Sequence, residues 1–116
     1  MPLPRILKRT SGENPVFTLC LEPDQMVFRG HFPENPILPG VVQVEWAIRL
    51  GAEAFGSLGA FLGLERLKFQ EITRPGETLE LSLALETTPK GRRLRFRFMG
   101  ASGPKSSGIA LFEALP

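Results

Sequence analysis

One helix is predicted in this chain, over residues 40–55, which read GVVQVEWAIRLGAEAF. Apolar residues occupy nearly the whole circumference of this helix, a pattern typical of a helix around which a sheet wraps. The following segment 56–59, Gly-Ser-Leu-Gly, ends it. Before it, Pro33, Pro36 and Pro39 forbid a regular helix and remove backbone donors, so a stiff loop leads into the helix.

Most of the remaining chain reads as β-structure. Leucine at every second position from Leu79 to Leu85 gives a strand over 78–87 the alternation of a half-buried strand. Further strands are predicted over 16–21, 61–72, 92–99 and 108–114, with a shorter one at 26–29 and a loop at 102–105. One central helix followed by long antiparallel strands predicts a single α+β domain covering residues 1–116.

Composition bounds the kind of protein. Hydrophobic residues make up 42% and charged residues 22% of the 116, as in ordinary globular proteins. Cys20 is the only cysteine, which indicates a reducing compartment. No apolar run is long enough for a signal peptide or a membrane span, so we expect a cytoplasmic protein without a membrane partner. The net charge of +2 favours an acidic partner without naming it, and one histidine with one cysteine makes no metal site.

The candidate chemistry lies around the start of the predicted helix. His31, the only histidine, can gain and lose a proton near neutral pH, and it sits beside the proline-rich loop. Glu45 neighbours Val41 and Ile48 in a largely apolar helical row, which would favour a carboxyl group that holds a proton and acts as an acid. The backbone N–H of Gly40, at the positive end of the helix dipole, suits a carbonyl oxygen that becomes negative.

A nucleophile is missing from this set. No serine or threonine lies between His31 and Glu45 in the sequence, and nothing indicates that Cys20 is near them. The pattern therefore favours proton abstraction next to a carbonyl over acyl transfer through a covalent intermediate.

These residues resemble a known family. The segment 30–33, Gly-His-Phe-Pro, through 36–41, Pro-Ile-Leu-Pro-Gly-Val, to Glu45 strongly resembles the 3-hydroxyacyl-acyl carrier protein dehydratases of the hotdog fold. Residues 68–69 and 74–79 resemble the second signature of that family, and the likeness covers nearly the whole chain. Gln43 and Trp46, on either side of Glu45, look closer to the short dehydratases of aryl polyene clusters.

The resemblance implies a curved antiparallel sheet wrapped around the helix, in a homodimer or higher even-numbered oligomer whose matching His and acid come from different subunits. His31 would abstract the C2 proton of a 3-hydroxyacyl thioester carried by an acyl carrier protein. Glu45 would help to protonate the leaving C3 hydroxyl, and the Gly40 N–H would polarise the thioester carbonyl. The product would be a trans-2-enoyl thioester, formed without a cofactor. The substrate-binding residues would be Phe32, Pro39, Val41 and Trp46.

One residue departs from the family pattern. Arg49 stands where the family usually has glutamine, one helical turn after Glu45. A cation there would favour the charged carboxylate, so Arg49 points elsewhere, or Glu45 orients a water, or the two form a helix salt bridge. A hotdog acyl thioesterase and a non-catalytic acyl-binding or scaffold subunit are the alternative functions. The proline-rich histidine loop disfavours the first, and Arg49 supports the second.

A basic strand face is the last feature of note. Arg93, Arg95 and Arg97 alternate with Leu94, Phe96 and Phe98, so that one face is basic and the other apolar. The basic face is either a solvated outer surface or a docking surface for an acidic carrier protein or its phosphopantetheine phosphate, with help from Lys90 or Arg66. Nucleic acid is disfavoured, because the aromatic rings fall on the apolar face.

Overall fold

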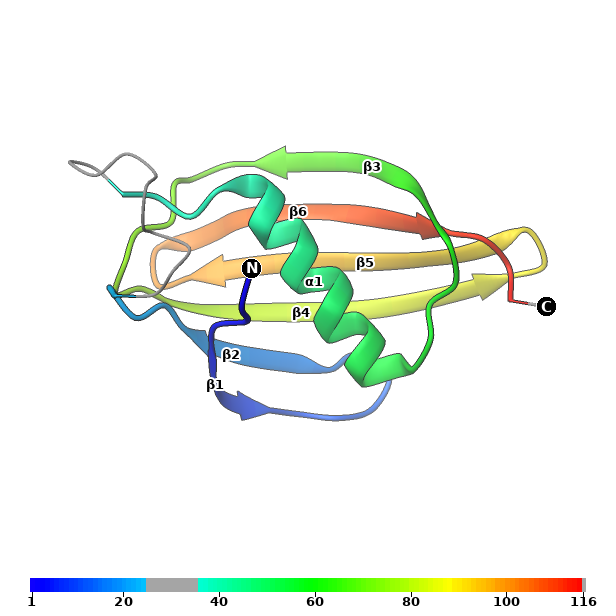
Figure 1. The fold of residues 1–116 in the computed structure, drawn as a ribbon, viewed down its shortest axis with the longest axis horizontal. Coiled ribbons are helices and arrows are strands. Elements are labelled where there is room, and N and C mark those ends of the chain that lie inside the picture. The colour runs from blue at the N-terminus through cyan, green and yellow to red at the C-terminus, as the bar shows by residue number, and fades with distance from the viewer. Residues whose placement is uncertain (25–35, 116) are drawn as a thin grey trace.

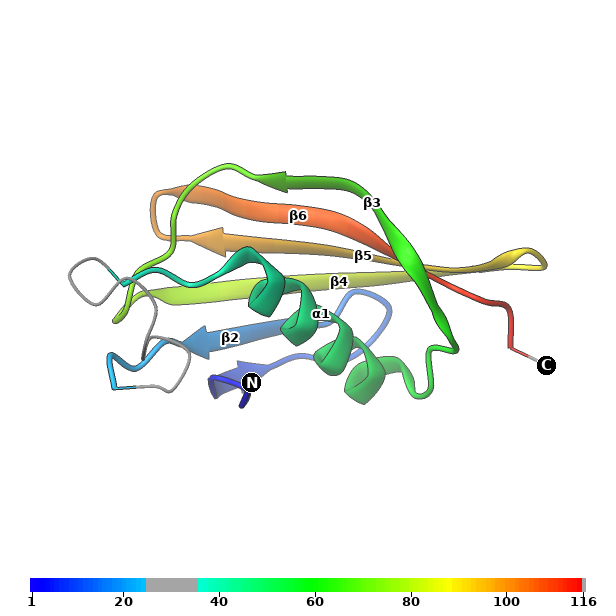
Figure 2. The same ribbon diagram turned by 45° about the horizontal axis from the view of Figure 1, so that its top comes forward.

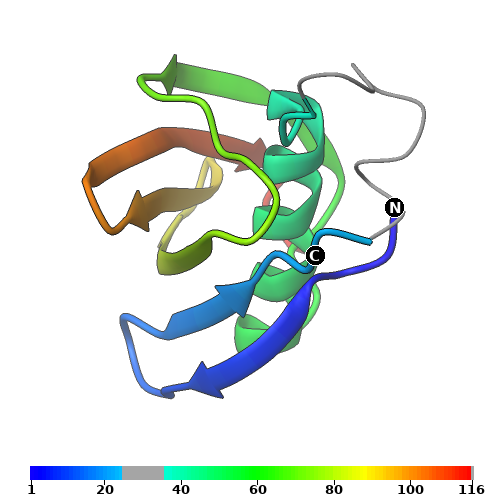
Figure 3. The same ribbon diagram turned by 90° about the vertical axis from the view of Figure 1, so that its left-hand side faces the viewer.

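A computed structural model of the protein describes residues 1–24 and 36–115. Within them the elements follow one another as β1 (Arg5–Arg9), β2 (Val16–Cys20), α1 (Gly40–Phe55), β3 (Phe61–Phe69), β4 (Thr78–Thr88), β5 (Gly91–Gly100) and β6 (Gly103–Phe112) (Figure 1). These strands form one antiparallel sheet in the order β1-β2-β4-β5-β6-β3. The helix lies across one face of the sheet (Figure 2), and the sheet curves around it (Figure 3).

The helix has the limits that the sequence pattern predicts. It begins at Gly40, directly after the extended Pro39 with φ −62° and ψ 144°, and it ends at Phe55. Gly56 follows with φ 83°, a left-handed conformation that glycine adopts without steric penalty, and its N–H bonds the Ala52 carbonyl at 2.9 Å. Local signals at both ends therefore set its length.

Three strand predictions are corrected. β1 was not predicted, because its sequence RILKR is mostly charged and exposed; it forms by pairing with β2 at an edge of the sheet. β6 begins at Gly103 instead of 108, because its first half buries the polar Lys105 and Ser106, which hides the apolar alternation. β3 ends at Phe69, not 72. The strand predicted at 26–29 lies outside the described residues.

The core forms between the helix and the inner face of the sheet. Its largest fully buried side chains include Trp46 and Leu50 from the helix, with Phe96 and Phe98 from β5. Burial of each such side chain contributes roughly 1.5–3 kcal/mol to folding. Gly51 allows the helix to approach the sheet closely, because a Cβ there would lie 2.7 Å from a methyl carbon of Leu94.

Strand β3 leaves an apolar surface uncovered. It is an edge strand, hydrogen-bonded to β6 on one side. Its exposed apolar side chains, together with two from flanking segments, form what we call the β3 patch: Val41, Phe61, Leu62, Leu64, Leu67, Phe69 and Ile72. Val41, on the first turn of the helix, is 77% exposed. An apolar edge strand of this kind is a surface that proteins normally cover.

Candidate active site at the helix start

The start of the helix opens onto a groove. The groove has a volume of about 360 Å³ and is lined by Ile37, Leu38, Gly40, Gln43, Phe69, Gln70, Glu71 and Ile72. A Cβ on Gly40 would lie 2.6 Å from the tip of the Phe69 ring, so glycine is what allows this ring to pack against the helix start. In the described part of the chain no acceptor takes the Gly40 N–H. As the first residue of a helix, Gly40 offers that donor to a ligand.

A buried glutamine holds the helix start in place. Gln43 is 3% exposed, and its Nε2 donates to the Leu38 carbonyl at 3.3 Å. Its Oε1 accepts a hydrogen bond of 2.6 Å from the Ser106 hydroxyl on β6. The Leu38 N–H donates to the Thr73 carbonyl at 2.8 Å. These bonds fix the turn before Gly40 to the sheet. Their signal in the sequence was Gln43 itself, a polar residue within the apolar run of the helix.

Glu45 lies in polar surroundings, which corrects the expectation of an apolar row. Its side chain is 41% exposed, and its Oε1 lies 3.9 Å from Nη1 of Arg49 and 3.2 Å from the nitrogen of Met1. The possible Glu45–Arg49 ion pair is therefore present. Arg49 also donates to the Met1 carbonyl at 2.6 Å. Sequence reasoning missed these neighbours because residues 1–2 reach the helix only through the tertiary fold.

The other predicted site residues fall into three groups. Pro39 and Val41 flank Gly40 in the chain without being part of the groove lining, and Val41 shares a helix face with Glu45. Trp46 is fully buried in the core, where its Nε1 donates to the Pro2 carbonyl at 3.1 Å. His31 and Phe32 lie outside the described residues. Contact of any of these side chains with substrate stays a prediction.

The buried Lys105 forms ion pairs with Glu71, which lines the groove, and with Glu77; we call these three residues the clamp. Lys105 is 3% exposed, and its Nζ lies 2.9 Å from both Glu71 and Glu77 and 3.0 Å from the Ile72 carbonyl. Burial acts to lower the pKa of Lys105, but hydrogen bonds and charge from the two glutamates outweigh it and raise the pKa. The hydrogen bonds from Lys105 and Ser102 lower the pKa of Glu71. The clamp joins β6 to the segment after β3.

Acid is expected to weaken this clamp. Because the pKa of Glu71 is lowered below its ordinary value of 4.5, the ionised carboxylate stabilises the fold above that value, and this contribution is lost as the pH falls through the folded pKa. Glu71→Gln should lower stability at neutral pH and make the loss in acid less steep. Urea unfolding between about pH 7 and about pH 3 measures both effects.

The matched control is Glu80→Gln, which neutralises an exposed carboxylate on β4 that has no ion pair in the described part of the chain. Its pH dependence should follow that of the parent protein. Equal curves for Glu71→Gln and the parent would contradict the stabilising role of the clamp.

Two searches of residues 1–24 and 36–115 gave negative results. They contain no group of three or more His, Cys, Asp or Glu side chains arranged to hold a metal ion. None of their helices combines the length and the apolar character needed to cross a membrane.

Comparison with known proteins identifies the family to which this fold belongs. A family model for the ApeI-like dehydratases matches residues 7–109. The 3-hydroxyacyl-acyl-carrier-protein dehydratase FabZ of Latilactobacillus sakei is 37% identical over 89 residues, covering 71% of this chain and 64% of that protein. FabZ of Anoxybacillus flavithermus is 33% identical over 116 residues, covering 94% and 74%. The chain thus spans somewhat less than two thirds of the L. sakei relative.

A solved dehydratase structure has the same fold as this chain. A chain of the dehydratase heterocomplex ApeI:P from Xenorhabdus doucetiae superposes with a TM-score of 0.80 at 28% identity, over 93% of this chain and 96% of that one. The curved antiparallel sheet around one helix, with the glycine-led helix start facing a groove, defines a hotdog protein of the dehydratase type. More narrowly, the chain belongs to the ApeI-like dehydratase family.

Proposed function

We propose that this protein dehydrates 3-hydroxyacyl thioesters, carried by an acyl carrier protein, to trans-2-enoyl thioesters in fatty-acid or aryl-polyene-type biosynthesis. The observation that carries the proposal is the family match over residues 7–109. The groove at the helix start supports it, because this groove presents the Gly40 N–H where a thioester carbonyl could accept it.

Each residue has a role in a balanced elimination. His31 takes the C2 proton, and the electrons of that C–H bond form the C2–C3 double bond. The C3–O bond breaks, and the hydroxyl leaves as water after it accepts a proton from a second water that Glu45 orients, which in turn takes up the proton that His31 removed from C2. The Gly40 N–H donates to the thioester oxygen as negative charge develops there. Oε1 of Glu45 accepts a hydrogen bond from the Met1 nitrogen and lies 3.9 Å from Nη1 of Arg49, and this positive charge favours a Glu45 that orients a water for the leaving hydroxyl.

The active assembly is a homodimer in which the β3 edges meet. The exposed apolar side chains of the β3 patch support this pairing, since Phe61 is 52% exposed and Phe69 is 51% exposed. Phe69 also lines the groove at the helix start, where it packs against Gly40, so a second copy over the β3 patch would cover that groove. His31 of one copy would then complete the site of the other. A cytoplasmic location stays a prediction.

A non-catalytic acyl-binding subunit is the second candidate. The Glu45–Arg49 ion pair favours it, because a cation 3.9 Å from the carboxylate stabilises the charged form, which cannot donate a proton. In such a protein the groove at the helix start would bind an acyl thioester without turnover.

One assay separates these functions. The protein is incubated with a 3-hydroxyacyl thioester of N-acetylcysteamine, and both enoyl thioester absorbance and free thiol are recorded. Growth of the enoyl signal without thiol release is the expected result. Thiol release would indicate a thioesterase, and binding of the thioester with neither product would indicate the acyl-binding subunit.

A further inference from the structure

One buried polar side chain lines the groove at the helix start. Gln43 is 3% exposed, whereas the other two polar side chains of the lining, Gln70 and Glu71, are exposed. The Glu71 carboxylate already accepts from Lys105 and Ser102, and it has no proton to donate to a ligand. Of the described residues that line this groove, Gln43 is therefore the one that offers a buried side-chain donor.

The amide of Gln43 has one donor left over. In the described part of the chain its two N–H groups have a single acceptor, the Leu38 carbonyl at 3.3 Å, while its oxygen accepts from the Ser106 hydroxyl. The Leu38 carbonyl can only accept, which fixes the nitrogen end of the amide, and rotation of the side chain would break both bonds. A buried donor without a partner is costly, so this free N–H suits a ligand in the groove.

Gln43 and the Gly40 N–H open on the same side of the helix start. Residues three apart share a helical face, and helical side chains lean toward the N-terminus. The bond from Gln43 to Leu38 agrees with that direction, since Leu38 lies two residues before Gly40. The Gly40 N–H also has no acceptor among the described residues. Two free donors therefore face one groove.

A β-bulge in β3 sets the apolar wall of this groove. Arg66 and Leu67 together oppose one residue of β6. Residues four apart face the same side of a regular strand, but Glu65 faces outward and Phe69, beyond the bulge, packs inward against Gly40. The aromatic wall lowers the polarity around the two donors, and hydrogen bonds to a ligand are stronger in such surroundings.

Glu45 lies on the other side of the helix. Two residues correspond to about 200° of helical rotation, so its side chain points away from that of Gln43. Glu45 is not part of the groove lining, and its neighbours are Met1 and Arg49. A thioester placed across the helix start would thus have Gln43 on the side of its carbonyl and Glu45 on the side of its C3 hydroxyl.

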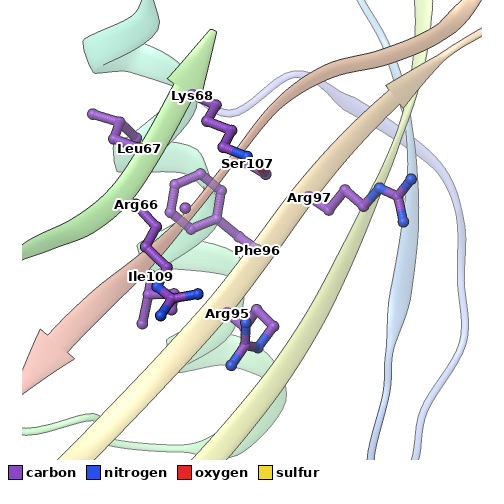
Figure 4. A pocket seen from close by; sticks show the side chains of 9 residues that line it. Arg66, Leu67, Lys68, Arg95, Phe96, Arg97, Ser107 and Ile109 are labelled. Carbon is purple, nitrogen blue, oxygen red and sulfur yellow. The ribbon is translucent and has the colours of Figure 1, made fainter. Parts of the chain in front are cut away.

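The larger groove on the other face of the sheet is less suited to a carbonyl oxygen. It has a volume of about 540 Å³ and runs over β3, β6 and β5 (Figure 4). Its cations are exposed, among them Arg95 and Arg97 on the basic face that the alternation of β5 predicts. Water and salt screen exposed charges, so they stabilise a carbonyl oxygen less than a buried donor does.

We infer that Gln43 is a second hydrogen-bond donor to the thioester carbonyl, beside the Gly40 N–H; the inference rests on the proposed function. Negative charge develops on that oxygen as the C2 proton is removed, and two fixed donors stabilise it more than one does. Because the charge develops on the way to the transition state, Gln43 acts on kcat more than on substrate binding.

Gln43→Met is the first test, since methionine has a similar length and no polar hydrogen. With a 3-hydroxyacyl thioester of N-acetylcysteamine, kcat should fall about 100-fold or more, as with loss of one oxyanion donor, and KM should change little. Ser106→Ala is the matched control, because it removes a bond that holds Gln43 and leaves the amide donor in place. Its kcat should stay within about tenfold of the parent.

An unreactive analogue separates a donor from a merely structural glutamine. Hexanoyl-N-acetylcysteamine with carbon-13 at its carbonyl has no hydroxyl to eliminate. Its infrared carbonyl stretch should lie at higher frequency when bound to Gln43→Met than to the parent, because loss of a hydrogen bond stiffens the C=O bond. Ser106→Ala should keep the parent frequency. If Gln43→Met does not fold, Gln43→Asn, whose amide is one carbon shorter, takes its place with the same expected results.

The outcomes separate this inference from the proposed function. If the parent does not dehydrate but Gln43→Met still raises the carbonyl frequency, the proposed function fails and the donor role of Gln43 stands. If the parent dehydrates and Gln43→Met keeps its rate and frequency, the inference is overturned while the proposed function stands. Equal changes in Gln43→Met and Ser106→Ala, a rise in KM alone, or no binding of the analogue by the parent would also overturn the inference.

Discussion

His31→Ala is expected to reduce the rate of dehydration by about 100- to 10,000-fold, the range that general acid–base catalysis supplies through one group. His31 is the only histidine in the chain, so no second imidazole can replace it. The loss should fall on kcat, because the proton transfer occurs in the transition state while Gly40 and the groove still bind the thioester. Enoyl absorbance with the N-acetylcysteamine thioester measures this loss without any contribution from carrier docking.

Thermal unfolding of His31→Ala provides the control for this experiment, since a folded variant should melt close to the parent. Glu45→Gln is the comparison variant, because it keeps the shape of the side chain and removes its charge. If His31→Ala keeps a rate within about tenfold of the parent, His31 is not the general base of the dehydration.

Trp46→Ala is expected to lower the free energy of unfolding by about 3–5 kcal/mol, as large-to-small changes in protein cores do. Trp46 is fully buried between the helix and the sheet, and neighbouring core residues such as Leu50 are equally buried. The change would leave a cavity and remove the hydrogen bond to the Pro2 carbonyl. Because Trp46 is the only tryptophan, denaturant unfolding must be followed by circular dichroism.

Trp46→Phe separates the cost of the lost hydrogen bond to the Pro2 carbonyl from the cost of the cavity. It keeps an aromatic ring in the core and removes the indole N–H, so it should be destabilised by about 1 kcal/mol through the hydrogen bond, plus a smaller cavity term. Equal destabilisation by alanine and phenylalanine would show that the hydrogen bond to residue 2, and not packing, dominates at this position.

Local signals made the helix and the central strands predictable from sequence. Pro39 and Gly56 mark the limits of an apolar run, and the leucines of β4 alternate at the period of a strand. Both features depend on residues close together in the chain. The motif from Gly30 to Glu45, which resembles the dehydratase family, is local in the same sense. The groove-facing position of Gly40 followed from the same helix start.

Features that depend on distant residues were not predictable. Lys105 looks like a loop residue until Glu71 and Glu77 are brought to it by the fold. β1 carries the charges of an exposed segment and becomes a strand only because β2 offers it a partner. Part of the polar surroundings of Glu45 comes from Met1, 44 positions earlier in the chain, whereas the ion pair with Arg49 is local and was considered from the sequence.

The bulge at Arg66 and Leu67 has a consequence for insertions and deletions in β3. Glu65 pairs with Ile109 and Lys68 with Ser107, so loss of one of the two residues between them would leave a regular strand in which Lys68 and Phe69 keep their partners and their sides of the sheet. Phe69 would therefore stay against the helix start at Gly40. Loss of one residue from β3 should therefore be tolerated better at these two positions than elsewhere in the strand, with a change only in its local bend and twist.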